Sequence, residues 1–255
     1  MVNMRSKFTA ILAAGLLGAA PAAADEIKVL SAGAFLQVLT AMTPDFEKRT
    51  GHKLAVTRGT VGQLMKRVEE GEAFDLVVVT PATIEKLVAA GHVASGTARP
   101  LARVGIGVMV KEGAAKPDVG TVEAFKKTLL AAKSVAYNDP KSGASSGIYT
   151  AQLLDKLGIA DQIKPKEKLK QGGHVADLVI SGEAEIGLQQ ISEIVPLKGV
   201  TLAGPLPKEI QNYTVYSAGI GAKAASAGAA RALLETLVGP GAAAELKAKG
   251  MEPPG

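Results

Sequence analysis

Residues 135–149 read V-A-Y-N-D-P-K-S-G-A-S-S-G-I-Y: an apolar run, a turn, a small-residue loop and the start of a helical pattern. The apolar run predicts a short buried strand, and the apolar spacing from Ile148 onward predicts a helix. Such a loop leaves the first backbone N–H groups of the helix without partners, and the positive end of the helix dipole points at it. Because Ser145 and Ser146 add hydroxyl donors, the stretch predicts an anion site; an ordinary helix cap is the alternative.

The same order of strand, small-residue turn and helix occurs three times earlier in the chain. The strands of these units are predicted at residues 25–30, 53–57 and 75–79. The repetition predicts an α/β fold with mainly parallel sheets. Residues 103–111 form a further apolar strand that we expect to cross into a second domain, and residues 214–220 a strand that returns. We therefore expect one lobe to comprise residues 25–104 plus 216–255, and the other to comprise residues 105–215.

Four loops rich in small or polar residues each precede a predicted helix. They are residues 31–34, 58–62, 142–147 and 172–175. Ligands of open α/β sheets bind beyond the carboxyl ends of the strands, and pockets are frequent where two domains meet. The sequence therefore predicts one cleft between two lobes, with all four loops around it.

Residues 1–24 have the layout of a cleavable signal peptide. Arg5 and Lys7 form a basic start, residues 8–20 are apolar, and residues 22–24 provide an A-x-A cleavage site. The apolar run is too short to span a bilayer. This pattern predicts export, and thus a periplasmic protein.

Composition excludes several classes of function. The chain has no Cys, which rules out disulfides and thiolate metal sites. Its 29 basic and 24 acidic side chains are scattered, which argues against nucleic-acid binding. His52, His92 and His174 lie far apart in sequence and lack the spacing of a metal site.

Several longer motifs resemble the periplasmic molybdate-binding proteins, which are type II solute-binding proteins of ABC transporters. These motifs are S-A-G-A at 31–34, R-G-T-V-G-Q-L-M-K-R-V-E-E-G-E-A-F-D-L-V-V-V at 58–79, N-D-P-K-S-G-A-S-S-G-I-Y at 138–149, G-G-H-V-A-D-L-V-I-S-G-E-A-E-I-G-L at 172–188 and L-K-A-K-G-M-E-P-P at 246–254. The resemblance covers nearly all of the mature chain. It implies a two-lobed type II binding fold, each lobe a mainly parallel sheet flanked by helices, with two hinge crossings. It also implies a monomer without a cofactor that delivers a small anionic ligand to a membrane ABC permease.

The resemblance implies ligand contacts residue by residue, with two departures. Ala34 stands where the family usually has a hydroxyl, and Val61, beside Thr60, where it usually has a serine. A tyrosine position of the family falls on Gln190, whereas backbone N–H donors near Ser146 and at Val175 are kept. The expected ligand-binding residues are Gly33, Ala34, Arg58, Thr60, Val61, Ser145, Ser146, His174, Val175 and Gln190.

Arg58 leaves the identity of the ligand open. Neutral donors and helix ends can hold a bare oxyanion such as molybdate, but an arginine suits a planar carboxylate, which it grips through two parallel hydrogen bonds. A small organic acid is therefore the alternative to a molybdate-like oxyanion if Arg58 faces the cleft. A side chain on the surface is the third interpretation.

Catalysis is not expected from the sequence. No G-x-S-x-G motif surrounds Ser145 or Ser146, and Asp139 precedes a proline in a turn. Glu193 is either a polar wall of the cleft or a carboxylate at a helix start. Because several roles of an active site have no candidate, we expect a receptor; an enzyme or an adhesin on the same scaffold is the distant alternative.

Overall fold

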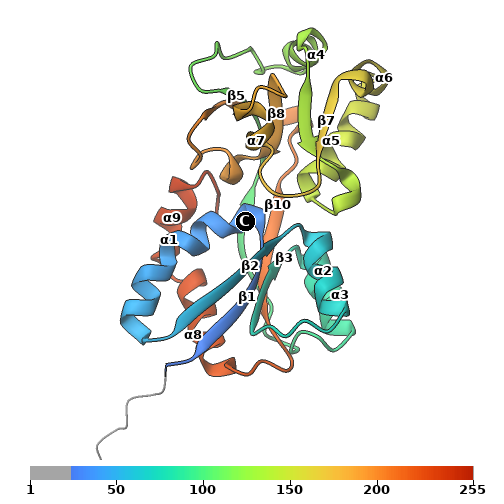
Figure 1. The fold of residues 1–255 in the computed structure, drawn as a ribbon. Coiled ribbons are helices and arrows are strands. Elements are labelled where there is room, and N and C mark those ends of the chain that lie inside the picture. Colours follow the sequence, from blue (N-terminus) through green and yellow to red (C-terminus); the bar gives the residue numbers. More distant parts are fainter. Residues whose placement is uncertain (1–23, 255) are drawn as a thin grey trace, which may run out of the picture.

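The computed structural model describes residues 24–254, which form two lobes (Figure 1). The predicted signal peptide lies outside the described residues except for Ala24. Each lobe is built on one five-stranded sheet. In Figure 1, lobe 1 is the lower and lobe 2 the upper, and β10 runs between them.

The sheet of lobe 1 has the strand order β2-β1-β3-β10-β4. Its strands are β1 (Glu26–Ala32), β2 (Lys53–Gly59), β3 (Leu76–Val79), β4 (Arg99–Val104) and β10 (Thr214–Ile220). The helices of this lobe are α1 (Gly33–Thr50), α2 (Val61–Glu69), α3 (Pro81–Ala89), α8 (Ala227–Val238) and α9 (Ala242–Ala248). β1 pairs in parallel with β2 and β3, whereas β10 is antiparallel to β3 and β4.

The sheet of lobe 2 has the order β7-β6-β8-β5-β9. Its strands are β5 (Ile106–Lys111), β6 (Val135–Asn138), β7 (Glu167–Lys170), β8 (Ile186–Gln190) and β9 (Val200–Pro205). Its helices are α4 (Val122–Ala131), α5 (Ser145–Lys156), α6 (Ala160–Ile163) and α7 (Ala176–Ile180), and a 3-10 turn, η3 (Ile191–Glu193), follows β8. β6 is parallel to β7 and β8, and β5 is antiparallel to β8 and β9.

Both sheets are covered on two faces by apolar side chains. In lobe 1, Phe35 and Leu39 of α1 belong to the cluster on one face, and Leu64 of α2 and Ile84 of α3 to the cluster on the other. Lobe 2 has two clusters as well. All four residues of β3 are buried, as the continuous apolar run in the sequence predicts. No helix within residues 24–254 combines the length and the apolar character needed to cross a membrane.

The predicted two-lobed α/β fold is confirmed, with three differences in detail. Each sheet is mixed and not mainly parallel, because the returning strand β10 and the entering strand β5 run against their neighbours. Residues 103–111 form parts of two strands in different sheets, separated at Gly105, where a Cβ atom would lie 2.9 Å from the amide of Gln211. The edge strand β9, residues 200–205, has no counterpart among the strands predicted from the sequence.

The exact lobe limits stay a proposal. The strands of the two sheets fall within the ranges expected for the lobes, except that β10 begins at Thr214 and not at residue 216. We keep residues 25–104 plus 216–255 and residues 105–215 as the proposed lobes.

Candidate functional site

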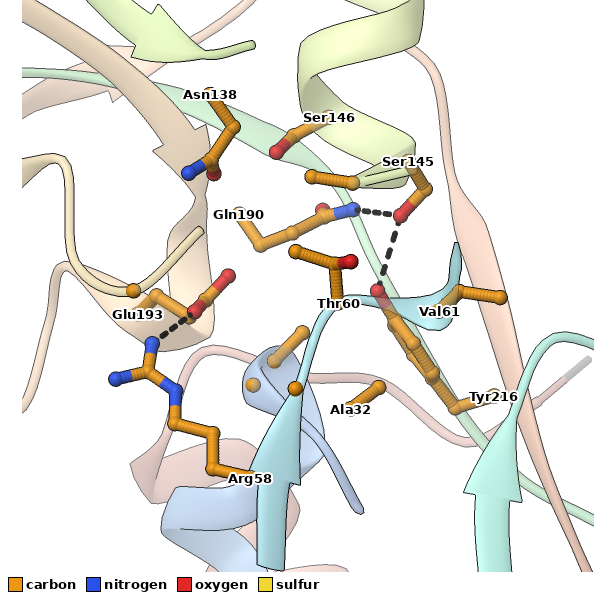
Figure 2. A pocket seen from close by; sticks show the side chains of 15 residues that line it. Ala32, Arg58, Thr60, Val61, Asn138, Ser145, Ser146, Gln190, Glu193 and Tyr216 are labelled. Atoms are coloured by element: carbon orange, nitrogen blue, oxygen red, sulfur yellow. Dashed lines mark hydrogen bonds and ion pairs between the residues drawn. The ribbon is translucent and has the colours of Figure 1, made fainter. Parts of the chain in front are cut away.

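A cleft lies where the two lobes meet, at the carboxyl ends of β1 and β2 in lobe 1 and of β6 and β8 in lobe 2 (Figure 2). The space within it that a water-sized molecule can enter is small, about 30 Å³. Its walls are formed by Ala32, Gly33, Ala34, Arg58, Gly59, Thr60, Val61, Asn138, Ala144, Ser145, Ser146, Gly173, Gln190, Glu193 and Tyr216.

The lobes touch each other through polar contacts at the edge of the cleft. The backbone N–H of Gly62 donates to the carbonyl oxygen of Gly143, at 3.2 Å. A Cβ atom on Gly62 would lie 2.8 Å from Cα of Gly143, so this approach requires glycine. Ser192 Oγ of lobe 2 donates to the carbonyl oxygen of Ala34 in lobe 1, at 2.7 Å. The structure is therefore that of the closed form of the cleft.

An ion pair crosses the cleft. Arg58, at the end of β2, places its Nη2 atom 2.8 Å from Oε1 of Glu193 in η3 (Figure 2). The side chain of Glu193 is 8% exposed and that of Arg58 is 25% exposed. Gly33, the first residue of α1, packs against the pair: a Cβ atom there would lie 2.6 Å from Glu193 Oε1. Arg58 thus faces the cleft and holds a buried carboxyl group of the other lobe.

Burial changes the proton affinities of the groups around Arg58. It raises the pKa of Glu193 to about 7, although the positive charge and the hydrogen bond of Arg58 act in the opposite direction. The half-buried His174 lies beside the pair, with Nδ1 3.4 Å from Arg58 Nη2. Burial, and then the charge of Arg58, lower the pKa of His174. The site therefore contains a carboxyl group that gains and loses its proton near neutral pH, next to a neutral imidazole.

The raised pKa of Glu193 predicts a pH dependence of stability. Between the ordinary carboxyl pKa and about 7 the folded state binds more protons than the unfolded state, so the free energy of unfolding falls as pH rises through this window. The loss is up to about 3 kcal/mol for a shift of this size. Urea unfolding at pH 5, 6, 7 and 8 measures it, and the Glu193→Gln variant should lack this component. Parallel pH profiles for the two proteins would contradict the assignment.

Helices α1 and α5 both begin at the cleft without a side-chain cap in the described part of the chain. Their first N–H groups are therefore the backbone donors that can reach a ligand. Helix α2 differs, because Thr60 caps it in a reciprocal pair of hydrogen bonds with Gln63. The hydroxyl of Thr60 also donates to the carbonyl oxygen of Ser142 across the cleft. Thr60 thus caps α2 and also forms a hydrogen bond that joins the two lobes.

A second polar group lies at the opposite end of the cleft. The hydroxyls of Ser145 and Tyr216 are 3.1 Å apart, and the side-chain amide of Gln190 lies 3.4 Å from Ser145 Oγ. The hydrogen bonds of this amide are satisfied when its oxygen accepts from Thr214 Oγ1, at 2.9 Å, and its nitrogen donates to the carbonyl oxygens of Val104 and Gly105. Burial raises the pKa of Tyr216, so its phenol stays protonated.

Eight of the ten residues expected to bind a ligand line the cleft: Gly33, Ala34, Arg58, Thr60, Val61, Ser145, Ser146 and Gln190. His174 contacts Arg58 and does not line the cleft. Val175 departs from the expectation that its N–H points at the ligand: it is fully buried and donates to Gln189 Oε1, at 2.9 Å. The role of these residues as ligand contacts stays a prediction.

Three polar residues of the cleft were not among the expected ligand contacts: Asn138 and Tyr216, and Glu193, which was considered only as a wall of the cleft. Asn138 and Glu193 follow the general rule that residues at or just beyond the carboxyl end of a strand face the ligand. That rule could have indicated both. Tyr216 lies inside β10, and nothing in its local sequence marks it.

Gly147 holds α5 against the cleft, and its replacement by alanine is expected to destabilise the fold. A Cβ atom at this position would collide with the carbonyl oxygen of Asn138. We expect Gly147→Ala to lower the free energy of unfolding by about 1–3 kcal/mol, because the backbone must shift. Gly228→Ala, in α8 where a Cβ atom meets nothing within 4 Å, is the control and should raise it by about 0.5–1 kcal/mol. Equal urea midpoints for both variants would show that α5 has room at Gly147.

Comparison with known proteins places the chain among binding proteins. The family described as bacterial extracellular solute-binding protein matches residues 27–252. An aconitate isomerase from Pseudomonas sp. and the molybdate-binding protein ModA of Azotobacter vinelandii are each 32% identical, with 96% of either chain covered. The solved structure of the periplasmic molybdate-binding protein of A. vinelandii superposes with a TM-score of 0.75 at 23% identity, covering 90% of this chain and all of the other.

One of these relatives corrects an expectation. The sequence led us to expect no enzyme, and this is overturned because a relative that is similar along nearly its whole length is named as an isomerase. The expectation rested on the absence of a nucleophile with an adjacent base. An isomerase that only moves a proton needs no such nucleophile.

Proposed function

Because the chain belongs to the bacterial extracellular solute-binding protein family, we propose that its cleft binds a small polycarboxylate and interconverts the cis and trans forms of aconitate. The observation that carries the proposal is the buried pair of Arg58 and Glu193 across the cleft. The similarity to an aconitate isomerase supports it.

Binding of a polycarboxylate follows from the donors of the cleft. Arg58 offers a planar guanidinium, which matches a carboxylate through two parallel hydrogen bonds. The uncapped starts of α1 and α5 add backbone N–H groups and the positive ends of two helix dipoles. A ligand with several carboxylates can use these donors at once.

The chemistry of aconitate determines what the protein must supply. The molecule carries a methylene group next to a carbon–carbon double bond. Removal of one methylene proton gives an anion spread over three carbons and the attached carboxylates, and return of the proton to the far carbon shifts the double bond. Rotation about a carbon–carbon bond before the shift decides whether the new double bond is cis or trans. One proton leaves and one returns, so the step needs a base and no oxidant.

Glu193 is the group in the cleft suited to carry this proton. A base is most effective when its pKa lies near the working pH, and burial raises the pKa of Glu193 to about 7. A substrate carboxylate that pairs with Arg58 competes for the guanidinium, which frees Glu193 and places positive charge where the anion develops. The chain has no Cys, so it has no thiol of its own for the alternative route to a cis–trans change, in which a thiol adds to the double bond and is lost again.

Calorimetric titration tests the binding half of this proposal. The ligands are tricarballylate, a saturated tricarboxylate that cannot isomerise, together with cis- and trans-aconitate, molybdate and sulfate. We expect heat with the tricarboxylates and a weaker response to the inorganic oxyanions. Tight binding of molybdate with no response to any carboxylate would overturn the proposal.

An oxyanion receptor is the second candidate function. The uncapped helices α1 and α5 and the similarity to molybdate-binding proteins favour it. An ionised Glu193 in the cleft repels a bare dianion, and it repels a carboxylate ligand as well. Oxyanion binding should therefore strengthen as pH falls below 7.

Location and partner belong to the same proposal. We infer that residues 1–24 direct export to the periplasm and that a membrane ABC permease is a partner, since the family is one of extracellular solute-binding proteins. Binding to purified permease in proteoliposomes, with and without ligand, tests the second inference.

A further inference from the structure

We propose that Asn138 and the start of α5 form a carboxylate subsite in lobe 2, so that the substrate must carry one carboxylate for Arg58 and another for Asn138. This inference rests on the proposed function and names the ligand class that the same cleft selects. It assigns a specificity role to Asn138, which was not among the residues expected to bind a ligand.

The side chain of Asn138 is buried and has an unused donor. The residue ends β6, lines the cleft and is 3% exposed. Its Nδ2 atom has no hydrogen-bond partner among residues 24–254. Figure 2 shows the amide directed into the cleft, near Ser146 and on the other side from Arg58. A buried donor of this kind costs free energy unless a ligand accepts from it.

Neighbouring hydrogen bonds fix which way round the amide of Asn138 lies. The backbone N–H of Val175 can only donate, and it donates to Oε1 of Gln189, at 2.9 Å. Gln189 must then present Nε2 on its other side, where it donates to the carbonyl oxygen of Gly173 at 2.9 Å and to Oδ1 of Asn138 at 3.3 Å. Because Oδ1 is taken by this donor, Nδ2 is the atom left for the cleft.

The start of α5 supplies the rest of the subsite. The cap residue Ala144 has no side-chain acceptor, and the twelve-residue helix opens with Ser145 and Ser146, both in the wall of the cleft. Gly147 lets this first turn pack directly on the backbone of Asn138. One place in the cleft is therefore lined by the first backbone N–H groups of α5, the positive end of the helix dipole and Nδ2 of Asn138. Such a place is suited to an anion.

The two anchors lie on different lobes, since Arg58 ends a strand of lobe 1 and Asn138 a strand of lobe 2. A monocarboxylate reaches one of them, whereas a molecule with two or three carboxylates spans both and favours the closed form. A tetrahedral oxyanion does not need Nδ2 and Arg58 together.

Two substitutions of Asn138 separate a subsite from a structural role. Asn138→Asp keeps the shape of the side chain and the oxygen that accepts from Gln189, but it replaces the NH₂ donor by a negatively charged oxygen. Asn138→Ala removes the amide altogether, both the acceptor and the donor. A subsite predicts that affinity for tricarballylate falls about 10-fold in Asn138→Ala and roughly 100-fold or more in Asn138→Asp, because like charges then meet. If Asn138 has only a structural role, Asn138→Ala should lose more affinity for tricarballylate than Asn138→Asp. Calorimetry at pH 8 measures both affinities.

Thr150→Val is the matched control. Within residues 24–254, Thr150 Oγ1 is the other buried side-chain nitrogen or oxygen atom that has no hydrogen-bond partner, and Thr150 does not line the cleft. Its affinity for tricarballylate should equal that of the wild type. If the wild-type protein binds no tricarboxylate, the proposed function fails and the subsite with it. If the wild type binds and Asn138→Asp binds equally well or better than Asn138→Ala, the subsite alone is overturned.

Discussion

Replacing Glu193 by glutamine is expected to reduce the turnover of cis-aconitate by roughly 10²–10⁴-fold, the usual contribution of a positioned general base. Glutamine keeps the size of the side chain and can accept a hydrogen bond from Arg58, but it cannot take a proton from carbon. Affinity for tricarballylate should stay the same or increase, because a competing acidic group near Arg58 has been removed. The measurement is the initial rate of trans-aconitate formation, followed by chromatography.

The pH profile and a control variant make this result specific. Turnover of the wild type should rise with pH and level off above about 7, because only ionised Glu193 accepts a proton. Glu72→Gln removes a carboxylate that pairs with Arg67 away from the cleft, and it should leave the rate unchanged. A Glu193→Gln protein with wild-type turnover would remove Glu193 from the mechanism.

Replacing Arg58 by alanine is expected to weaken tricarballylate binding by roughly 100-fold, the upper end of what a charge-assisted hydrogen bond contributes. The substitution also leaves Glu193 buried without its partner, which strongly lowers stability when the carboxyl group is ionised. Calorimetry measures the first effect, and urea unfolding at pH 8 the second.

A double variant separates the two consequences of the Arg58 substitution. Adding Glu193→Gln to Arg58→Ala removes the orphaned charge, so much of the lost stability should return while the affinity stays low. If Arg58→Ala binds tricarballylate as well as the wild type does, Arg58 is only a structural partner of Glu193 and the carboxylate proposal fails.

Local sequence patterns were sufficient to predict which loops line the cleft. A small-residue loop between a strand and a helix is a short-range signal, and the loops at 31–34, 58–62 and 142–147 all contribute to the walls of the cleft. The break of residues 103–111 into β4 and β5 was harder to see, because it depends on how closely Gln211 approaches Gly105. Gly105 and Gln211 are far apart in the sequence, and no local pattern encodes a contact between such distant residues.

The chemistry of the site depends on contacts between distant parts of the chain. Arg58 and Glu193 are 135 positions apart, and the raised pKa of Glu193 results from burial in the closed cleft. Val175 shows the same limit, because only the structure reveals that Gln189 accepts from its N–H. Thr60 is different: its capping box with Gln63 is a four-residue pattern and could have been inferred from the sequence.

Proton NMR of cis-aconitate incubated with the wild-type protein at pH 8 shows whether the cleft isomerises this compound. We expect trans-aconitate signals to appear faster than in buffer alone, and we expect Glu193→Gln to abolish this gain while still binding tricarballylate. Cis-aconitate that stays unchanged beside a wild-type protein shown to bind tricarballylate would contradict proton transfer by this cleft.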